Sequence, residues 1–382
     1  MNNGAGMSGH THPALVEAIQ DQAEQGTLYT KPSELLVEAA EAITERWDAV
    51  DTVRFTNSGT ESTMHAIRVA RAHSGRDKIL KIEGSYHGVH DYALISKSAP
   101  REKLGHPKHP RKVIESDGVP DAVADTVEVG PWNDIDAIED ILQEQVREIG
   151  AIIVEPIVMN VGVTQPYGEF LGGLRELCDE YGLVYIFDEV KTGVKVAPGG
   201  AAELYGVDPD LVAMAKSIGG NVPVGAFGGD DAVMAEITDG AAHFGTYNAN
   251  PLALRAVITQ LREVLTGDAY DHVDALGERL ARGYEDVLAD HGIAGHVDWG
   301  QLPGDDQLLR GARPRLPRLP RERRRGLPRE LLVRDAQPGR ARPPPPPVPA
   351  VDDQRPAHPR ARRRAPGDVQ GGGTTAGAKA VT

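Results

Sequence analysis

The chain has 382 residues, 40% of them apolar, a net charge of −15 and one cysteine. This length is sufficient for one large α/β domain or two smaller ones, and the composition is typical of a globular enzyme. No window is apolar over the length that a bilayer requires, and the first residues, "MNNGAGMSGHTHPAL", have neither a basic region nor an apolar core. We therefore expect a cytoplasmic protein with no membrane partner. Cys178 lies in the helical pattern "EFLGGLRELCDEYG", where we expect a buried, unreactive thiol and no disulfide.

The charge is divided unevenly along the chain. Residues 301–382 carry 18 Lys and Arg against 8 Asp and Glu, whereas the first 300 residues carry 23 against 48. A body this acidic repels nucleic acid and anionic membranes, so neither is an expected partner. It suits either an ordinary acidic cytosolic enzyme or a protein adapted to high salt, where counterions screen the self-repulsion.

Helix and strand patterns alternate from about residue 13 to residue 300. The pattern predicts a helix over "SELLVEAAEAITERW", with Ser33 as its N-cap and one apolar face made of Leu36, Ala40, Ile43 and Trp47. The next predicted elements are the strand "TVRFT", the helix "TESTMHAIRVARAH", the strand "KILKIE", a loop near 98–120, the helix "DIDAIEDILQEQVREIG", and the strands "AIIVE", "LVYIFD" and "LVAMA". Short buried strands that alternate with helices indicate an α/β fold with a mainly parallel sheet.

The composition changes after Trp299. Residues 301–382 contain 15 of the 28 prolines and no Ile, Phe, Tyr or Met. Such a segment cannot bury a core, so we expect it to be disordered. Two origins stay open: a genuine basic tail, or a shifted reading frame in GC-rich DNA, which yields arginine, proline, alanine and glycine. The abrupt change favours the shifted frame.

Four short stretches follow predicted strands and carry chemically useful side chains. These are "TNSGTE" with Ser58, Gly59 and Thr60; "GSYHG" with Tyr86 and His87; "FDEVKTG" with Asp188; and "AMAKSIGGNVPVGAFGG", in which Lys216 ends an apolar run before a glycine-rich turn. Each signal alone is weak, because such residues also occur in ordinary turns and caps. In an open α/β sheet, however, the carboxyl ends of the strands share one crevice, so we expect the four stretches to form one site.

Together these residues match the needs of pyridoxal 5′-phosphate (PLP). Its phosphate needs an anion cradle at a helix N-terminus, its ring needs a stacking face, its pyridine nitrogen needs a carboxylate, and its aldehyde needs a lysine amine. Burial lowers the pKa of an amine and makes it nucleophilic, which explains the apolar setting of Lys216. Other sites are poorly supported: the His pairs have no cysteine or carboxylate partners for a metal, and neither a dinucleotide-binding nor a P-loop glycine pattern is present. We expect no metal.

At these residues the chain resembles the class-III aminotransferases of fold type I, and within them most closely the glutamate-1-semialdehyde 2,1-aminomutases. The resemblance runs from about residue 9 to residue 300 and includes "GHTHPALVEAI", "FTNSGTESTMHAIRVARAHSGRDKILKIEGSYHG", "EPIVMNVG", "IFDEVKTG" and "FGTYNANPLA". It implies a PLP-dependent enzyme that transfers the amino group of a small amino acid or amine, and a homodimer.

The resemblance also implies roles for single residues. It makes Lys216, Asp188 and Tyr86 the catalytic residues: Lys216 binds the cofactor covalently, Asp188 pairs with the pyridine nitrogen, and Tyr86 stacks on the ring. The implied cofactor-binding residues are Ser58, Gly59, Thr60, Tyr86, His87, Asn160, Asp188, Val190, Lys216 and Thr246. Among them, Thr246 resembles a residue that reaches the phosphate of the neighbouring subunit.

The chain departs from the aminomutase pattern at several places. It has "DEVKTGVK" and "GTYNANP" where the aminomutases usually have sequences like "DEVMTGFR" and "GTLSGNP", so Lys191 and Tyr247 change the substrate side. Amino-group movement within one molecule and transamination between two molecules therefore both stay open, as does a PLP-fold remnant without turnover. The predicted organisation is a shortened N-terminal segment with the first helices (1–50), the PLP-binding large domain (51–250), helices leading into an incomplete small domain (251–300), and the Arg/Pro-rich tail (301–382).

Overall fold

The structure is a computed structural model that describes residues 4–293 and 297. In these residues seven strands form one sheet in the order β1-β7-β6-β5-β4-β2-β3. The strands are β1 (Thr52–Thr56), β2 (Lys78–Ile82), β3 (Val127–Gly130), β4 (Ile149–Val154), β5 (Val184–Asp188), β6 (Leu211–Ala215) and β7 (Gly225–Gly229). All neighbours pair in parallel except β7, which is antiparallel to β1 and to β6. The predicted α/β fold with a mainly parallel sheet is confirmed.

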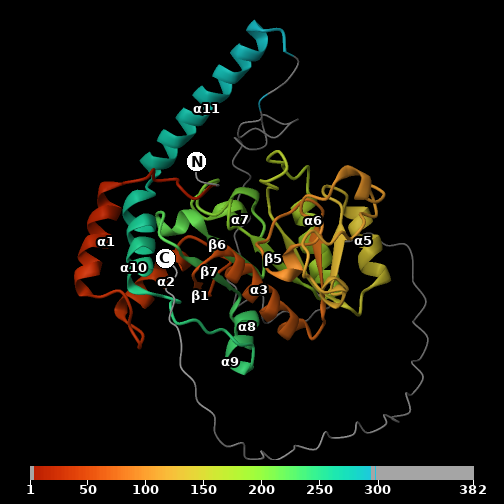
Figure 1. The fold of residues 1–382 in the computed structure, drawn as a ribbon, viewed down its shortest axis with the longest axis horizontal. Coiled ribbons are helices and arrows are strands. Elements are labelled where there is room, and N and C mark those ends of the chain that lie inside the picture. Colours follow the sequence, from red (N-terminus) through yellow and green to blue (C-terminus); the bar gives the residue numbers. More distant parts are fainter. Residues whose placement is uncertain (1–3, 294–296, 298–382) are drawn as a thin grey trace, which may run out of the picture. The chain divides into compact units, whose positions relative to one another are not determined.

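Helices connect and cover the strands (Figure 1). The α-helices are α1 (Pro13–Gln25), α2 (Glu34–Thr44), α3 (Gly59–Ser74), α4 (Asp121–Ala124), α5 (Ile135–Glu144), α6 (Phe170–Tyr181), α7 (Gly200–Tyr205), α8 (Asp231–Met234), α9 (Glu236–Asp239), α10 (Pro251–Thr259) and α11 (Gly267–Asp290). No helix among the described residues is both long and apolar enough to cross a bilayer.

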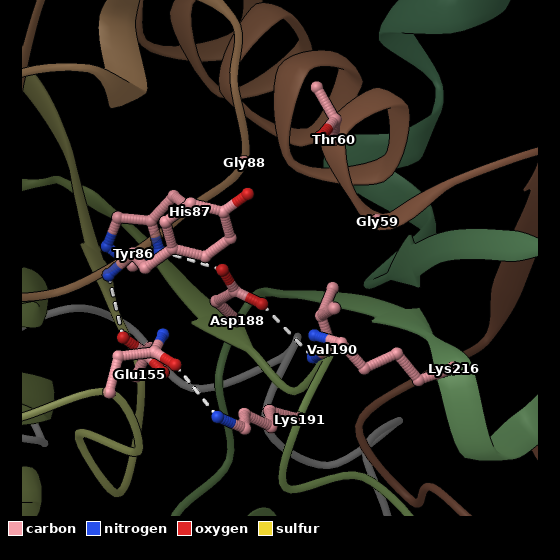
Figure 2. Close-up of a pocket in the computed structure, with 11 residues that line it drawn as sticks. Gly59, Thr60, Tyr86, His87, Gly88, Glu155, Asp188, Val190, Lys191 and Lys216 are labelled. Atoms are coloured by element: carbon pink, nitrogen blue, oxygen red, sulfur yellow. Dashed lines mark hydrogen bonds and ion pairs between the residues drawn. The ribbon is translucent and has the colours of Figure 1, made fainter. Parts of the chain in front are cut away.

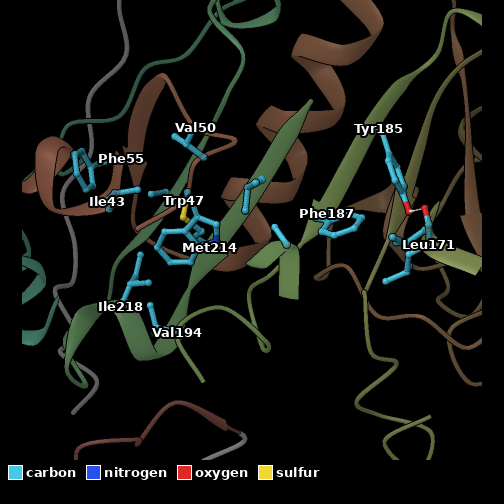
Figure 3. Close-up of a cluster of buried hydrophobic side chains, with 14 of the residues drawn as sticks. Ile43, Trp47, Val50, Phe55, Leu171, Tyr185, Phe187, Val194, Met214 and Ile218 are labelled. Atoms are coloured by element: carbon cyan, nitrogen blue, oxygen red, sulfur yellow. Dashed lines mark hydrogen bonds between the residues drawn. The ribbon is translucent and has the colours of Figure 1, made fainter. Parts of the chain in front are cut away.

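Successive strand residues point to opposite faces of the sheet, and each face has its own hydrophobic cluster. On one face Tyr185, Phe187 and Met214 pack with Trp47 and Ile43 and with residues of α6 and α10 (Figure 3). The other face carries the alternate strand residues, such as Ile153, Ile186 and Phe227, beneath α3. Burial on both faces explains why these strands are continuous apolar runs in the sequence. Cys178 lies buried in the first cluster, where burial raises the pKa of its thiol, as expected of an unreactive cysteine.

Two helices differ from the prediction: α2 in the face that it buries, and α5 in the residue at which it ends. The buried face of α2 is Leu35, Ala39, Ala42 and Ile43 rather than Leu36 and Ala40, which are only partly buried, and the Ser33 side chain makes no capping hydrogen bond. The apolar residues come in adjacent pairs, so periodicity alone could not choose between the two faces. The other helix, α5, stops at Glu144 instead of continuing to 150, because Ile149 begins a strand that pairs with β2.

The glycine-rich segment after Lys216 contains a strand that the sequence did not predict. Residues 225–229 form β7, inserted between β1 and β6. A Cβ on Gly228 would lie 2.4 Å from the Thr52 carbonyl oxygen, and one on Gly229 would lie 2.0 Å from the Asp210 carbonyl oxygen. The glycines are therefore required by close strand packing and not by a turn.

The remaining predicted segments are partly outside the described residues. The long helix α11 leaves several apolar side chains exposed, namely Leu276, Leu280, Tyr284 and Val287. The division of the chain into segments 1–50, 51–250 and 251–300 stays a prediction. The tail at 301–382, and with it both suggested origins, lies outside the described residues.

Candidate functional site

One cavity of about 390 Å³ lies where the carboxyl ends of the parallel strands meet the start of α3 (Figure 2). Eight of the ten predicted site residues line it: Gly59, Thr60, Tyr86, His87, Asn160, Asp188, Val190 and Lys216. They come from four strand ends and one helix, as the crossover topology of a parallel sheet dictates. The expectation that the four stretches share one crevice is therefore met, whereas the role of each residue stays a prediction.

The N-terminus of α3 faces this cavity with free amide groups. Ser58 caps the helix: its Oγ accepts a hydrogen bond from the Glu61 amide at 3.2 Å, and Glu61 Oε2 in turn accepts one from the Asn57 amide at 2.6 Å. The amides of Gly59 and Thr60 donate to no other group in the described part of the chain. A 16-residue helix that presents two unpaired N–H groups to a cavity is suited to bind an anion there.

Two glycines let the walls of this anion site approach closely. A Cβ on Gly59 would lie 2.6 Å from Val190 Cγ1, and a Cβ on Gly88 would lie 2.8 Å from Thr60 Cα. Gly88 also has a φ of +102°, which side chains rarely adopt. The start of α3 is thereby held against both the loop after β2 and the loop after β5.

We expect Gly59→Ala to displace the N-terminus of α3 from Val190. Overpacking of this kind costs about 1–3 kcal/mol of folding stability, and it should weaken phosphate binding at the site by about tenfold or more. Thermal unfolding and a titration with inorganic phosphate would measure the two effects. Gly172→Ala in α6 is the matched control, because its Cβ would meet only Glu169 Oε2 at 3.5 Å. An unchanged phosphate affinity in Gly59→Ala would contradict the assigned anion site.

Asp188 is the buried carboxylate of the site. Its Oδ1 accepts a hydrogen bond from the Val190 amide at 3.0 Å, and its Oδ2 lies 2.7 Å from His87 Nδ1. Burial raises the pKa of Asp188 to about 7 and lowers the pKa of His87 to about 3. At neutral pH His87 is therefore a neutral imidazole that adjoins a carboxyl group ready to carry a proton.

The hydrogen bonds of Ser85 fix the position of the proton between these two side chains. Ser85 Oγ lies 2.6 Å from the Ile82 carbonyl, which can only accept, so the single hydroxyl hydrogen is used there. His87 Nε2, 2.9 Å from the same oxygen, must then be the donor. A neutral His87 would then have no hydrogen on Nδ1, and a protonated Asp188 would donate its hydrogen bond to that atom. A cation beside Asp188 would favour transfer of this proton to Nδ1. His87 lines the cavity, and its two ring nitrogens lie within hydrogen-bond distance of Ser85 and Asp188, so it is suited to orient Asp188.

Lys216 follows β6 directly and begins a short 3₁₀ turn, Lys216–Gly219. Its φ is +53°, a left-handed conformation that costs a non-glycine residue free energy and that often occurs at functional sites. Burial lowers the pKa of its amine, and Asp188 opposes that shift. In the view of Figure 2 the Lys216 side chain extends toward Asp188 and Val190. An amine with a lowered pKa beside a buried carboxylate is suited to act as a nucleophile.

Three cavity residues were missing from the predicted catalytic and cofactor-binding residues, although the sequence had placed one of them, Lys191, on the substrate side. Glu155 Oε1 accepts a hydrogen bond from the Tyr86 amide at 2.7 Å and so orients that loop; burial raises the pKa of its carboxyl group. Gly88 supplies the close approach to α3. Lys191 donates a hydrogen bond to Asn160 Oδ1 at 2.8 Å. Glu155 could have been predicted from "AIIVEP", because a carboxylate that directly follows a buried parallel strand lies at the carboxyl edge of the sheet, as Asp188 does.

Two predicted residues lie outside the cavity lining. Ser58 caps α3 through its side chain, whose Oγ accepts the hydrogen bond from the Glu61 amide. Thr246 is exposed in the loop that carries Phe244 and Tyr247, whose side chains are 88% and 63% exposed. Within one copy of the chain, Thr246 therefore does not line the described cavity.

Comparisons with known proteins agree on one family. A family profile described as "Aminotransferase class-III" matches residues 4–298. Among curated relatives, glutamate-1-semialdehyde 2,1-aminomutase of Methanopyrus kandleri is 41% identical over 292 residues, which are 76% of this chain and 66% of the relative. The corresponding protein of Salinibacter ruber is 43% identical over 285 residues, covering 73% of this chain and 63% of the relative. The chain thus spans slightly less than two thirds of these relatives.

Solved structures give the same fold. An omega-transaminase from Sphaerobacter thermophilus superposes with a TM-score of 0.74 and 40% identity over 78% of this chain and 68% of that one. A glutamate-1-semialdehyde aminomutase from Pseudomonas aeruginosa PAO1 superposes with a TM-score of 0.70 and 28% identity over 78% of this chain and 66% of that one. The predicted fold type I architecture is thereby confirmed.

Proposed function

Because the chain belongs to the class-III aminotransferase family, we propose that it binds pyridoxal 5′-phosphate and transfers the amino group of a small substrate. The observation that carries this proposal is the pairing of Lys216 and Asp188 in one cavity, at the ends of neighbouring strands β6 and β5. The family to which the chain belongs uses this cofactor. The chain spans only part of its relatives, so its activity is part of the proposal.

The described residues fit the cofactor group by group. The free amides at the start of α3 suit its phosphate, and a Cβ on Gly59 would narrow this cradle. Asp188 suits the ring nitrogen, and Tyr86 and Val190 lie on opposite sides of Asp188 in the view of Figure 2, where they suit the two ring faces. Asn160 lines the same cavity and suits the ring hydroxyl.

Bound pyridoxal phosphate supplies an electron-withdrawing ring that stabilises negative charge on the amino-bearing carbon of a substrate. The chain contributes attachment, orientation and proton transfer. Lys216 Nζ is the amine that would hold the cofactor, and the same amine would take up and return a proton at the substrate. His87 Nδ1 lies 2.7 Å from Asp188 Oδ2, where it would accept a proton from Asp188 and so keep the carboxylate charged toward a cationic ring nitrogen.

Two reactions fit this site. The named relatives favour the aminomutase reaction, in which the amino group of glutamate-1-semialdehyde moves to the adjacent carbon and gives 5-aminolevulinate for tetrapyrrole synthesis. Transamination between two substrates is supported by the likeness to the omega-transaminase. Formation of 5-aminolevulinate without any added amino donor would identify the first, and a requirement for separate donor and acceptor would identify the second.

The proposal includes a homodimer in which Thr246 of one copy approaches the phosphate site of the other. The support is the exposure of the loop around Phe244, which presents apolar side chains at the surface. Sedimentation at several protein concentrations would test it, and a chain that stays monomeric while it binds cofactor would contradict it. The cytoplasmic location stays a prediction.

The first experiment is an absorption spectrum of the full chain with added pyridoxal phosphate, before and after borohydride reduction, followed by peptide mapping. We expect a yellow band that borohydride removes, with the label fixed on Lys216. No band, or label spread over surface lysines, would overturn the proposed function. A band on Lys216 without turnover of any amino donor would identify a cofactor-binding remnant.

A further inference from the structure

Three lysines are gathered at one side of the cavity. Lys191 and Lys195 lie in the loop that follows β5, and Lys216 follows the neighbouring strand β6. None of the ion pairs between described residues includes any of them. Burial lowers the pKa of Lys195 to about 7, and the positive charges of Lys216 and Lys191 add to this shift. The loop therefore concentrates positive charge that the described residues leave without an ion-pair partner.

Lys191 is the member of this group that reaches the cavity along with Lys216. Its ammonium donates to Asn160 Oδ1 at 2.8 Å, as the dashed line to the Lys191 nitrogen in Figure 2 marks. An ammonium has three N–H donors, so this bond leaves two for another acceptor. Lys195 does not line the cavity; its Nζ donates to the Lys191 carbonyl at 2.8 Å and so fixes the backbone that carries Lys191.

The N-terminal part of the chain covers this lysine pair. A Cβ on Gly4 would lie 3.2 Å from Lys191 Cε and 3.3 Å from Lys195 Nζ, so the Gly4 backbone packs directly on both side chains. Ser217 Oγ holds this segment in place through the carbonyls of Gly4 and Ala5, at 3.4 and 3.3 Å. Both lysines are half-buried under this segment, and partial exclusion of water strengthens the attraction between their charges and a bound anion.

We propose that Lys191, held in place by Lys195, is a binding site for the carboxylate group of the substrate. The proposal rests on the proposed function and deepens it: the substrate is an amino acid rather than a simple amine. The start of α3 provides a separate anion site for the phosphate, so the charge of Lys191 is left for a second anion. A carboxylate at Lys191 would lie in the same cavity as the Lys216 amine, which places the substrate near the reacting atoms.

The test uses the full chain with pyridoxal phosphate and a calorimetric titration with succinate, a dicarboxylate that has no amino group. We expect Lys191→Met to raise the succinate dissociation constant about tenfold, because a charge-assisted hydrogen bond is lost. Lys191→Arg keeps the charge and should stay within about threefold of the unchanged chain. Lys108→Met is the control, since that side chain is 59% exposed and lies outside the cavity lining.

Several outcomes would overturn the subsite. The first is that the chain does not bind succinate, and the second is that Lys191→Met binds succinate as tightly as the unchanged chain. The third is that Lys191→Met loses both cofactor and succinate binding and that Lys191→Arg loses them too. The last result would mean that Lys191 only positions Asn160. The yellow band on Lys216 reports the proposed function separately. A chain without the band that still binds succinate through Lys191 would support the subsite and refute the proposed function.

Discussion

Lys216→Ala is expected to abolish covalent attachment of pyridoxal phosphate and to lower any amino-transfer rate by roughly 10⁴-fold or more, as the loss of a covalent catalyst does. Burial lowers the pKa of the Lys216 amine, which favours its unprotonated, nucleophilic form. The amide groups at the start of α3 and the Asp188 carboxyl group are untouched by this substitution. Cofactor should therefore still bind, but without a covalent bond.

Borohydride reduction and peptide mapping of Lys216→Ala would measure this directly. The matched control is Lys108→Ala, an exposed lysine outside the cavity, which should keep the label on Lys216. The neighbouring amine of Lys191 makes the experiment informative, because it lines the same cavity. Transfer of the label to Lys191 with retained activity would contradict the assignment of Lys216 as the reactive amine.

The position of Lys216 was accessible from the sequence because local pattern and topology agree there. An apolar run such as "LVAMA" predicts a buried strand, and the residue after it must lie at the carboxyl edge of a parallel sheet. The same reasoning placed Asp188. It would also have found Glu155, which follows β4 in the same way. What it could not give was the left-handed φ of Lys216 or the hydrogen bond between Lys191 and Asn160, since both depend on packing between segments that are distant in the sequence.

The missed strand β7 shows the limit of propensity more clearly. Glycine is unfavourable in strands, so "GAFGG" resembles a turn when it is considered alone. The sequence carries no local sign that Gly225 must fit against Thr56 and Ser62, where a Cβ would lie 2.5 Å from each hydroxyl oxygen. Tertiary packing therefore overrides propensity at this strand, whereas strands such as "VYIFD" are specified by their own composition.

The second large effect concerns Asp188 and the pH dependence of stability in the cofactor-free chain. Burial raises the pKa of Asp188 from 3.8 to about 7 in the folded chain. Between about pH 4 and pH 7 the unfolded chain has lost this proton and the folded chain retains it, so the free energy of unfolding falls as the pH rises. This single group should remove roughly 4 kcal/mol across the window. In Asp188→Asn, which cannot ionise, this part of the slope should vanish.

Urea unfolding of both chains at intervals from pH 4 to pH 8 would give the difference in unfolding free energy, in which the shared contributions of the other titrating groups cancel. His87 contributes a slope of opposite sign, because it is neutral in the folded chain and takes up a proton on unfolding below about pH 6.5, and both chains share this contribution. Glu24→Gln, an exposed carboxyl group on α1, should retain the full slope of the unchanged chain. If the unfolding free energies of Asp188→Asn and the unchanged chain changed with pH in the same way from pH 4 to pH 8, Asp188 would already be ionised in the folded chain. The proton between Asp188 and His87 Nδ1 would then belong to His87, and the site would carry its carboxylate charge before any cofactor arrives.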